Sequence, residues 1–339
     1  MKRYQKIICL CLAVSMVFAM TGCSGTKQEA KDGRLKVVAT VFAEYDFLKN
    51  IAGDKIDLSM LLLPGADAHS FDPTPKDMVT VQEADLFVTI GGESDAWAET
   101  ILESVDKKME TVRLMDCVDE VVEEEVVEGM QTEEHHHDEA EEQEEHHDGE
   151  TEGQTEEHHD GEEKEFDEHV WTSPKNAMQI VQKLCDKLCS LDKENAAVYQ
   201  KNTKAYLAKL QKLDEQFTDI VTHAKRKEIV VADKFPFRYF ADAYDLKYYA
   251  AFPGCSTQTG ASMETIAFLI DKVKEDKIPV VFHMELSSES MCNTICDETG
   301  AKKAQLNAVH NVSRLDFEKG TGYVELMQEN VGVLREALN

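Results

Sequence analysis

The sequence has too few basic residues for a nucleic-acid-binding protein. It holds 36 Lys and Arg against 66 Asp and Glu, which gives a formal net charge of −30 at pH 7. No segment gathers Lys or Arg into a basic stripe, and the net field of the chain repels phosphate. We therefore expect no nucleic-acid partner.

The motifs of the common hydrolases are also missing. The chain contains no His-Glu-x-x-His, no Gly-x-Ser-x-Gly and no phosphate-binding glycine loop. Each of these motifs sets a metal, a nucleophile or backbone amides at the spacing that its reaction requires. The enzyme alternative is a secreted zinc hydrolase with three protein ligands and a catalytic water, and no obvious general base supports it. We predict that the protein is not an enzyme.

No apolar run in the leader is long enough for a comfortable membrane span. Ile7–Met20 follows three basic residues and has the length of a signal-peptide core. It ends in Met20-Thr-Gly-Cys23, which resembles a bacterial lipobox, whose cysteine is lipidated. We predict a signal peptide at 1–22, lipidation of Cys23, a tether at 23–34 and an extracytoplasmic protein anchored to the bacterial cell membrane. A plain signal peptide is the alternative.

The chain does contain an acidic insert of 50 residues, Asp119 to Glu168, with 25 Asp and Glu and one basic residue. Three runs of adjacent histidines flanked by acids lie in it. Imidazole is the commonest borderline metal ligand, and crowded carboxylates attract divalent cations. We predict a segment without secondary structure that collects metal, with zinc as the favoured ion; a solvated acidic linker is the alternative. Its histidines are His135, His136, His137, His146, His147, His158 and His159.

Six cysteines remain beyond Cys23. Cys185 and Cys189, like Cys292 and Cys296, are four residues apart, so each pair lies on one helix face. Soft-metal sites usually have two residues between their thiols. Buried small side chains and disulfides both remain open for the six.

The rest of the chain is predicted as an α/β protein with parallel sheets. Strand-like runs alternate with helical stretches, at 35–42, 56–63, 84–90, 228–232, 246–251 and 278–282. Strand, helix and strand at this spacing indicate crossover connections. Ser173 and Pro174 begin a helix. After Asp192, apolar residues recur every three or four positions, which predicts a second helix of about 30 residues, roughly 45 Å long.

Two histidines lie in loops that prolines stiffen. His69 stands between Pro64 and Pro75, just after a predicted strand, where α/β folds place their ligand sites. His169 directly precedes the helix that begins at Pro174. A single loop histidine is usually solvated, but two beside a His-rich insert indicate a metal site.

At these positions the chain closely resembles a known family, the metal-binding receptors of ABC importers for zinc and manganese. The resemblance covers nearly all of Leu35 to Leu338. It rests on Leu63-Pro64-Gly65 through Pro75, Ala84-Asp85-Leu86 with Gly91 and Trp97, His169-Val-Trp171 with Ser173-Pro174, and Tyr323 to Leu338. The family fold implies two Rossmann-like α/β lobes, here 35–191 and 227–339, joined by a long helix, here 192–226. The metal then lies in the cleft between the lobes.

The resemblance also implies a set of metal ligands. His69 and His169 match the first two ligands of the family. Asp233 takes the third position, usually His in zinc receptors and often an acid in manganese receptors, and His310 takes the fourth, usually an Asp. Three imidazoles and one carboxylate suit tetrahedral Zn²⁺, whereas Mn²⁺ favours more oxygen. Glu285 is a competing oxygen donor.

The function implied by the resemblance is capture and delivery. The receptor would bind Zn²⁺ and pass it to an ABC permease driven by its ATPase, and we expect a monomer. A manganese-specific receptor and a surface zinc buffer or adhesin are the alternatives. Because ligands must lose their protons, metal affinity should fall as the pH drops below the histidine pKa.

Overall fold

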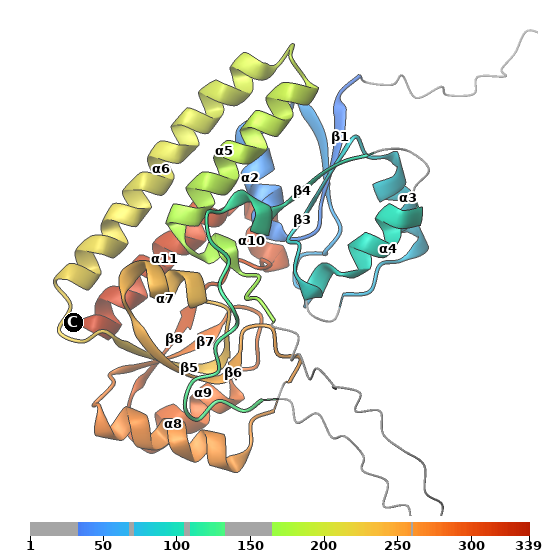
Figure 1. The fold of residues 1–339 in the computed structure, drawn as a ribbon. Coiled ribbons are helices and arrows are strands. Elements are labelled where there is room, and N and C mark those ends of the chain that lie inside the picture. Colours follow the sequence, from blue (N-terminus) through green and yellow to red (C-terminus); the bar gives the residue numbers. More distant parts are fainter. Residues whose placement is uncertain (1–32, 68–70, 105–108, 133–164, 259) are drawn as a thin grey trace, which may run out of the picture. The chain divides into compact units, whose positions relative to one another are not determined.

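Two parallel sheets organise the compact unit from Leu35 to Asn339. The computed structural model describes residues 33–67, 71–104, 109–132, 165–258 and 260–339. The first sheet has the order β2-β1-β3-β4 and the second the order β6-β5-β7-β8, with every pairing parallel (Figure 1). The predicted parallel α/β architecture, repeated in the two halves, is therefore confirmed. The strands are β1 Leu35–Ala39, β2 Ile56–Met60, β3 Leu86–Thr89, β4 Glu110–Arg113, β5 Glu228–Phe235, β6 Lys247–Pro253, β7 Val280–Met284 and β8 Lys302–Leu306.

Helices connect the strands of each sheet, and each sheet with its helices is called a lobe here. The short strands β4 and β8 were not predicted, because their mostly polar sequences, ETVR and KKAQL, lack the continuous apolar run of a doubly covered strand. No helix in the described part of the chain is long and apolar enough to cross a membrane. The helices of the first lobe are α2 Phe42–Ala52, α3 Pro75–Glu83, η1 Glu93–Asp95, α4 Trp97–Ser104 and η2 Leu114–Cys117. Those of the second lobe are α7 Arg238–Tyr244, α8 Met263–Glu275, α9 Ser290–Thr299 and α10 Arg314–Lys319.

Three long helices pack together and hold the lobes. They are α5 Pro174–Leu191, α6 Ala196–Thr222 and α11 Tyr323–Leu338. Ser173 is the N-cap of α5, as predicted, and α6 corresponds to the predicted long helix. At 27 residues, α6 is about 40 Å long and packs against α5, α2 and α11 (Figure 1). The predicted apolar positions of α6 are all buried: Tyr199, Tyr206, Leu210, Leu213, Phe217 and Ile220.

Asp46 of α2 ties these helices to the first lobe. Its carboxylate accepts hydrogen bonds from the Tyr206 hydroxyl of α6 and from the Tyr323 backbone amide of α11, each at 3.0 Å. Burial raises the pKa of Asp46, while these two hydrogen bonds oppose the rise. Because both helices also contact elements of the second lobe, this buried contact helps to couple the two lobes.

The prediction that the whole of Asp119 to Glu168 lacks structure is wrong at both ends. The Glu124 amide donates to the Glu165 carbonyl at 2.9 Å, and the Asp167 amide donates to the Val122 carbonyl at 3.0 Å. The overall acidic composition of the insert suggested a solvated segment, although several valines lie near its start. One of them, Val122, packs against the main core. Residues 133–164, which include all seven histidines of the insert, lie outside the described residues.

The six cysteines are free thiols. Cys185 and Cys189 lie one above the other on α5 with their sulfurs 3.9 Å apart, too far for a bond. Of the two alternatives that the sequence left open, the structure supports buried or half-buried thiols rather than disulfides.

Candidate metal centre

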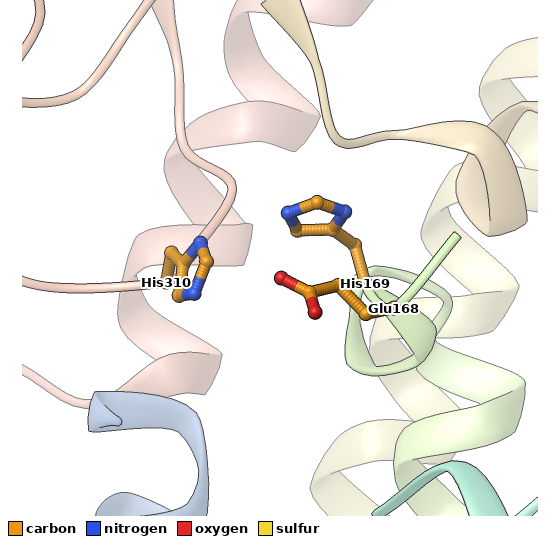
Figure 2. Close-up of side chains that lie close together, drawn as sticks. All are labelled: Glu168, His169 and His310. Atoms are coloured by element: carbon orange, nitrogen blue, oxygen red, sulfur yellow. The ribbon is translucent and has the colours of Figure 1, made fainter. Parts of the chain in front are cut away.

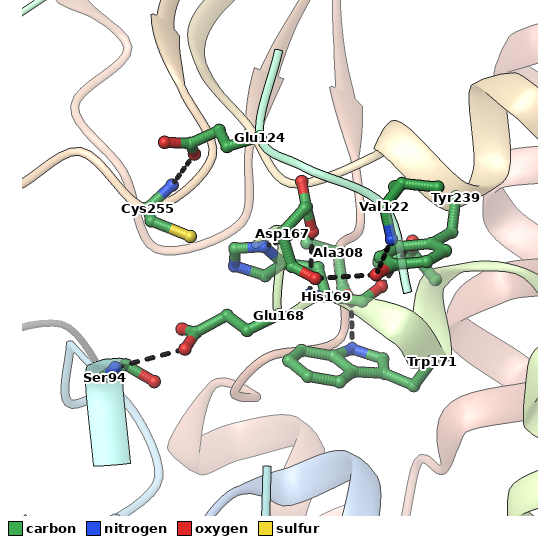
Figure 3. Close-up of polar contacts among 11 residues, drawn as sticks. Ser94, Val122, Glu124, Asp167, Glu168, His169, Trp171, Tyr239, Cys255 and Ala308 are labelled. Carbon is green, nitrogen blue, oxygen red and sulfur yellow. Dashed lines mark hydrogen bonds and ion pairs between the residues drawn. The ribbon is translucent and has the colours of Figure 1, made fainter. Parts of the chain in front are cut away.

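His169 is held rigidly by its own neighbours in the chain. The side chain is fully buried. Asp167 Oδ1 accepts a hydrogen bond from the His169 amide at 2.8 Å and lies 3.1 Å from His169 Nδ1 (Figure 3). This contact favours the tautomer with its proton on Nδ1, which leaves Nε2 as the electron-pair donor. A carboxylate that orients a metal-binding imidazole in this way is a regular feature of metal sites.

The environment of His169 stabilises its charged form. Burial lowers the pKa of His169, but Asp167, Glu168 and Glu124 together outweigh burial and raise it above 6.5. Protons therefore compete with a metal for this imidazole at a higher pH than for an exposed histidine. The same negative surroundings attract a divalent cation.

The turn that carries His169 is also anchored from a distance. Tyr239 of α7 donates from its hydroxyl to the Asp167 carbonyl at 2.7 Å, and Trp171 Nε1 donates to the Ala308 carbonyl at 2.9 Å (Figure 3). The Tyr323 hydroxyl donates to the Trp171 carbonyl at 2.7 Å. These bonds attach the turn to the second lobe and to α11.

His310 lies in the loop after β8, beside His169. The ring centroids of the two histidines are 5.2 Å apart, and Trp171 packs edge-on against His310 at 5.0 Å. Val309 takes a left-handed backbone conformation with φ 58°, and the His310 carbonyl accepts from the first amide of α2 at 3.2 Å. Tertiary contacts therefore hold this loop in a conformation that valine rarely adopts alone.

Glu168 completes a group of three side chains that could hold a metal ion. One donor atom each from Glu168, His169 and His310 lies within 4.8 Å of the others. Figure 2 shows the Glu168 carboxylate beside the His169 ring and facing the His310 ring. The Ser94 amide donates to Glu168 Oε2 at 3.1 Å, whereas Oε1 is buried with no hydrogen-bond partner among the described residues. A buried, unsatisfied carboxylate oxygen beside two imidazoles fits a divalent cation.

The sequence analysis counted Glu168 as the last residue of the acidic insert and did not name it as a candidate ligand. Its position directly before His169, within the stiff turn, was the available signal. Gly92 faces it from the first lobe, and a Cβ atom built on Gly92 would lie 2.5 Å from the Cβ of Glu168. Only glycine at this position leaves room for the carboxylate.

His69 lies outside the described residues, as do Cys23 and the insert histidines. The loop that leads to His69 is nevertheless placed next to His310. Asn311 Nδ2 donates to the carbonyls of Leu63 and Ala66, at 2.9 and 2.7 Å, and the Gly65 amide donates to Val312. Asp67, the last described residue before His69, lines the same cavity as His310. Placing His69 as a ligand stays a prediction that this anchoring favours.

Asp233 and Glu285, the predicted carboxylate ligands, line a cavity of about 490 Å³ that His310 also borders. Asp233 Oδ1 accepts from the Lys234 amide at 2.9 Å, while Oδ2 accepts from the Met284 amide at 3.2 Å and from the Ser287 hydroxyl. Asp233 is absent from the group of three donors that the structure brings together among its described residues. Its assignment as a ligand stays a prediction.

Glu285 supports the His310 loop through the backbone. Its Oε2 accepts from the Ala308 amide at 2.7 Å. Burial raises the pKa of Glu285 to about 7, although the amides of the 308–310 loop oppose the rise. The role that the structure supports is loop positioning, and metal binding by Glu285 also stays a prediction.

The family model described as the periplasmic zinc-uptake complex component A, ZnuA, matches residues 37–337. The chain belongs to the ZnuA family. The resemblance drawn from the sequence motifs is therefore confirmed.

Known relatives of the ZnuA family extend the comparison. The high-affinity zinc uptake system protein ZnuA of Bacillus subtilis is 33% identical over 96% of this chain and 95% of its own length. The zinc-binding lipoprotein AdcA of Streptococcus pneumoniae is 30% identical over 98% of this chain, which spans 61% of AdcA. The crystal structure of the metal-dependent lipoprotein YcdH of B. subtilis matches 90% of this chain and all of its own, with a TM-score of 0.70 and 28% identity. The Zn(II)-bound ZnuA-like domain of AdcA matches with a TM-score of 0.69 and 27% identity.

Proposed function

We propose that this protein is the extracytoplasmic receptor of a metal ABC importer, which captures Zn²⁺ between its lobes and delivers it to a membrane permease coupled to an ATPase. The observation that carries the proposal is the cluster of buried Glu168, buried His169 and half-buried His310, with donor atoms within 4.8 Å of one another (Figure 2). Relatives named for zinc binding and zinc uptake support the choice of ion.

The imidazole ligands we propose are His69, His169 and His310. His169 comes from the turn before α5 and His310 from the loop after β8. A single ion bound by both imidazoles would therefore link these two segments. The anchoring of the 63–67 loop on Asn311 supports a third imidazole from His69. Three nitrogen donors favour tetrahedral Zn²⁺ over Mn²⁺, which prefers oxygen and higher coordination numbers.

Two further parts of the chain serve the same function in this proposal. Lipidated Cys23 holds the receptor near its permease, and the name lipoprotein given to AdcA of S. pneumoniae supports an anchor. The histidines of the insert bind Zn²⁺ weakly and raise its local concentration near the cluster. The described C-terminal end of the insert, from Glu165, leads directly into Glu168 and His169, and backbone hydrogen bonds pair it with the N-terminal end.

The decisive experiment is a competitive titration with Zn²⁺ and Mn²⁺ against chromophoric chelators. The protein is compared with a variant in which residues 133–164 are replaced by a short polar linker, and with His310→Ala. We expect one tight zinc-preferring site that survives removal of the insert and is weakened by His310→Ala.

The alternatives give different results in the same titration. If the protein were a surface zinc buffer or adhesin that works through its insert, removing 133–164 would abolish binding. Tighter binding of Mn²⁺ than of Zn²⁺ would identify a manganese receptor. Tight zinc binding that ignores His310→Ala would contradict the proposed ligand set.

A further inference from the structure

We propose that Glu168, rather than Asp233, supplies the carboxylate that completes the zinc site. The inference rests on the proposed function and assigns the fourth ligand of the same site. Glu168 occupies no ligand position implied by the family resemblance. Its assignment comes from the environment of its side chain.

The Glu168 carboxylate is buried without the partners that a buried charge requires. The residue is 1% exposed. Among the residues described by the structure, no Lys or Arg forms an ion pair with it, and the Ser94 amide is the one hydrogen-bond donor to its side chain. Buried carboxylates are stable when they are paired with a cation or bound to a metal. A metal ion at Oε1 would supply the missing positive charge.

The backbone explains how two neighbouring residues can reach one ion. Successive side chains of an extended strand point to opposite faces. At His169 the chain instead turns tightly, with φ −83° and ψ 43°, and the Val170 amide donates to the Glu168 carbonyl at 2.9 Å. These angles approximate an inverse γ-turn. Figure 2 shows the result, with the Glu168 carboxylate beside the His169 ring and facing His310.

The surrounding lobes hold the carboxylate in that position. Gly92 packs against the Glu168 side chain without a Cβ atom of its own, and Ser94, two residues later, holds Oε2 through its amide (Figure 3). Asp95 in turn accepts from the Ile90 amide at 2.6 Å and from the Gly91 amide at 3.1 Å, which orders this turn. Oε1 is therefore the oxygen left for the ion.

The Asp233 carboxylate, unlike that of Glu168, has hydrogen-bond donors for both of its oxygens. Both of its carboxylate oxygens accept hydrogen bonds from its own lobe, namely from Lys234, Met284 and Ser287. These bonds stabilise the charge without a metal and tie β5 to the end of β7. We assign Asp233 to positioning those strand ends. The oxygen donor therefore comes from the turn before α5, next to the nitrogens of His169 and His310.

The test compares isosteric amides in the full chain. Zinc affinity is measured by chelator competition for the parent, Glu168→Gln, Asp233→Asn and the surface control Glu298→Gln. Cobalt absorption spectra report the coordination of the tight site. We expect Glu168→Gln to weaken zinc binding about 100-fold or more and to change the cobalt spectrum, since it removes an anionic ligand. Asp233→Asn should leave the cobalt spectrum unchanged.

The remaining outcomes of this experiment would overturn either the Glu168 assignment or the proposed function. If Glu168→Gln binds zinc within about threefold of the parent, or if the loss and the spectral change follow Asp233→Asn, the assignment is overturned. Absence of a tight site in the parent would instead refute the proposed function. If Glu168→Gln does not fold, as judged by circular dichroism, Gly92→Ala replaces it, because that variant displaces the carboxylate without removing it. Parent-like zinc binding by folded Gly92→Ala would then overturn the assignment.

Discussion

Replacing Gly92 by alanine is expected to weaken zinc binding by moving Glu168. Gly92 has φ −101° and ψ −167°, an extended conformation that alanine adopts without strain. The substitution therefore acts only through the steric overlap of the new Cβ atom with its neighbours. The new Cβ would lie 2.5 Å from the Cβ of Glu168 and 3.0 Å from its Cδ, whereas ordinary contacts begin at 3.4 Å.

The size of the effect follows from that overlap. Relieving it requires the two Cβ atoms to separate by about 0.9 Å, and rotation about side-chain bonds cannot help because the clash includes the Cβ of Glu168 itself. A zinc–oxygen bond is about 2.0 Å long, so a shift of this size breaks or strains it. We expect zinc affinity to fall about 10- to 100-fold, as for changes that misplace a ligand. This corresponds to about 1.4–2.7 kcal/mol of binding free energy.

The assay is competition with a chromophoric chelator near neutral pH, with thermal unfolding of the metal-free protein as a check on folding. Gly332→Ala in α11 is the matched control, because its Cβ would meet no atom within 4 Å. That variant should bind zinc like the parent and be no less stable, since alanine favours helix. If Gly92→Ala binds zinc as tightly as Gly332→Ala, the reasoning about Glu168 is refuted.

Three further predictions concern stability, each measured by unfolding in the presence of a metal chelator. Tyr239→Phe removes the hydroxyl that donates to the Asp167 carbonyl and should lower the free energy of unfolding by about 1–3 kcal/mol. An unchanged urea midpoint would contradict this prediction. Burial raises the pKa of Asp95 from 3.8 to about 7. Its stabilising contribution is thus complete below pH 3.8 and lost as the pH rises through about 7. Asp95→Asn should therefore gain stability relative to the parent, on the order of 3 kcal/mol, from about pH 5 to about pH 8, and a parallel pH dependence of the two proteins would exclude this. Leu210 in α6 is 0% exposed, and Leu210→Ala should lower the free energy of unfolding by about 2–5 kcal/mol. The control Leu315→Ala, at a residue that is 60% exposed, should lower it by less than about 0.5 kcal/mol. Equal losses would show that α6 is not a core helix.

Local patterns were sufficient for most of the architecture. The apolar runs predicted six of the strands, because strands covered on both faces have continuous apolar sequences. The three-to-four spacing after Asp192 predicted α6, because only a helix places those residues on one face. The strands β4 and β8 escaped prediction, since most of their residues are polar and only partly buried or exposed.

Local sequence patterns also predicted part of the candidate metal site. The stiff turn before α5 and the family motifs pointed to His169, and the structure places His310 beside it. Composition suggested that the whole acidic insert was without structure, but a few valines and backbone pairs order its ends. Averages over a segment conceal such contacts, because one buried side chain can outweigh many solvated charges.

By itself, the sequence determined the parallel α/β elements and the long α6, and it predicted a metal site from histidines in proline-stiffened loops, since these depend on residues close together in the chain. Only the tertiary structure decided which carboxylate stands beside the imidazoles. Glu168 meets His310 because Trp171 binds the Ala308 carbonyl and Gly92 leaves space, while the backbone and hydroxyl groups around Asp233 engage its oxygens. Such convergence depends on packing between distant segments, which no local pattern encodes.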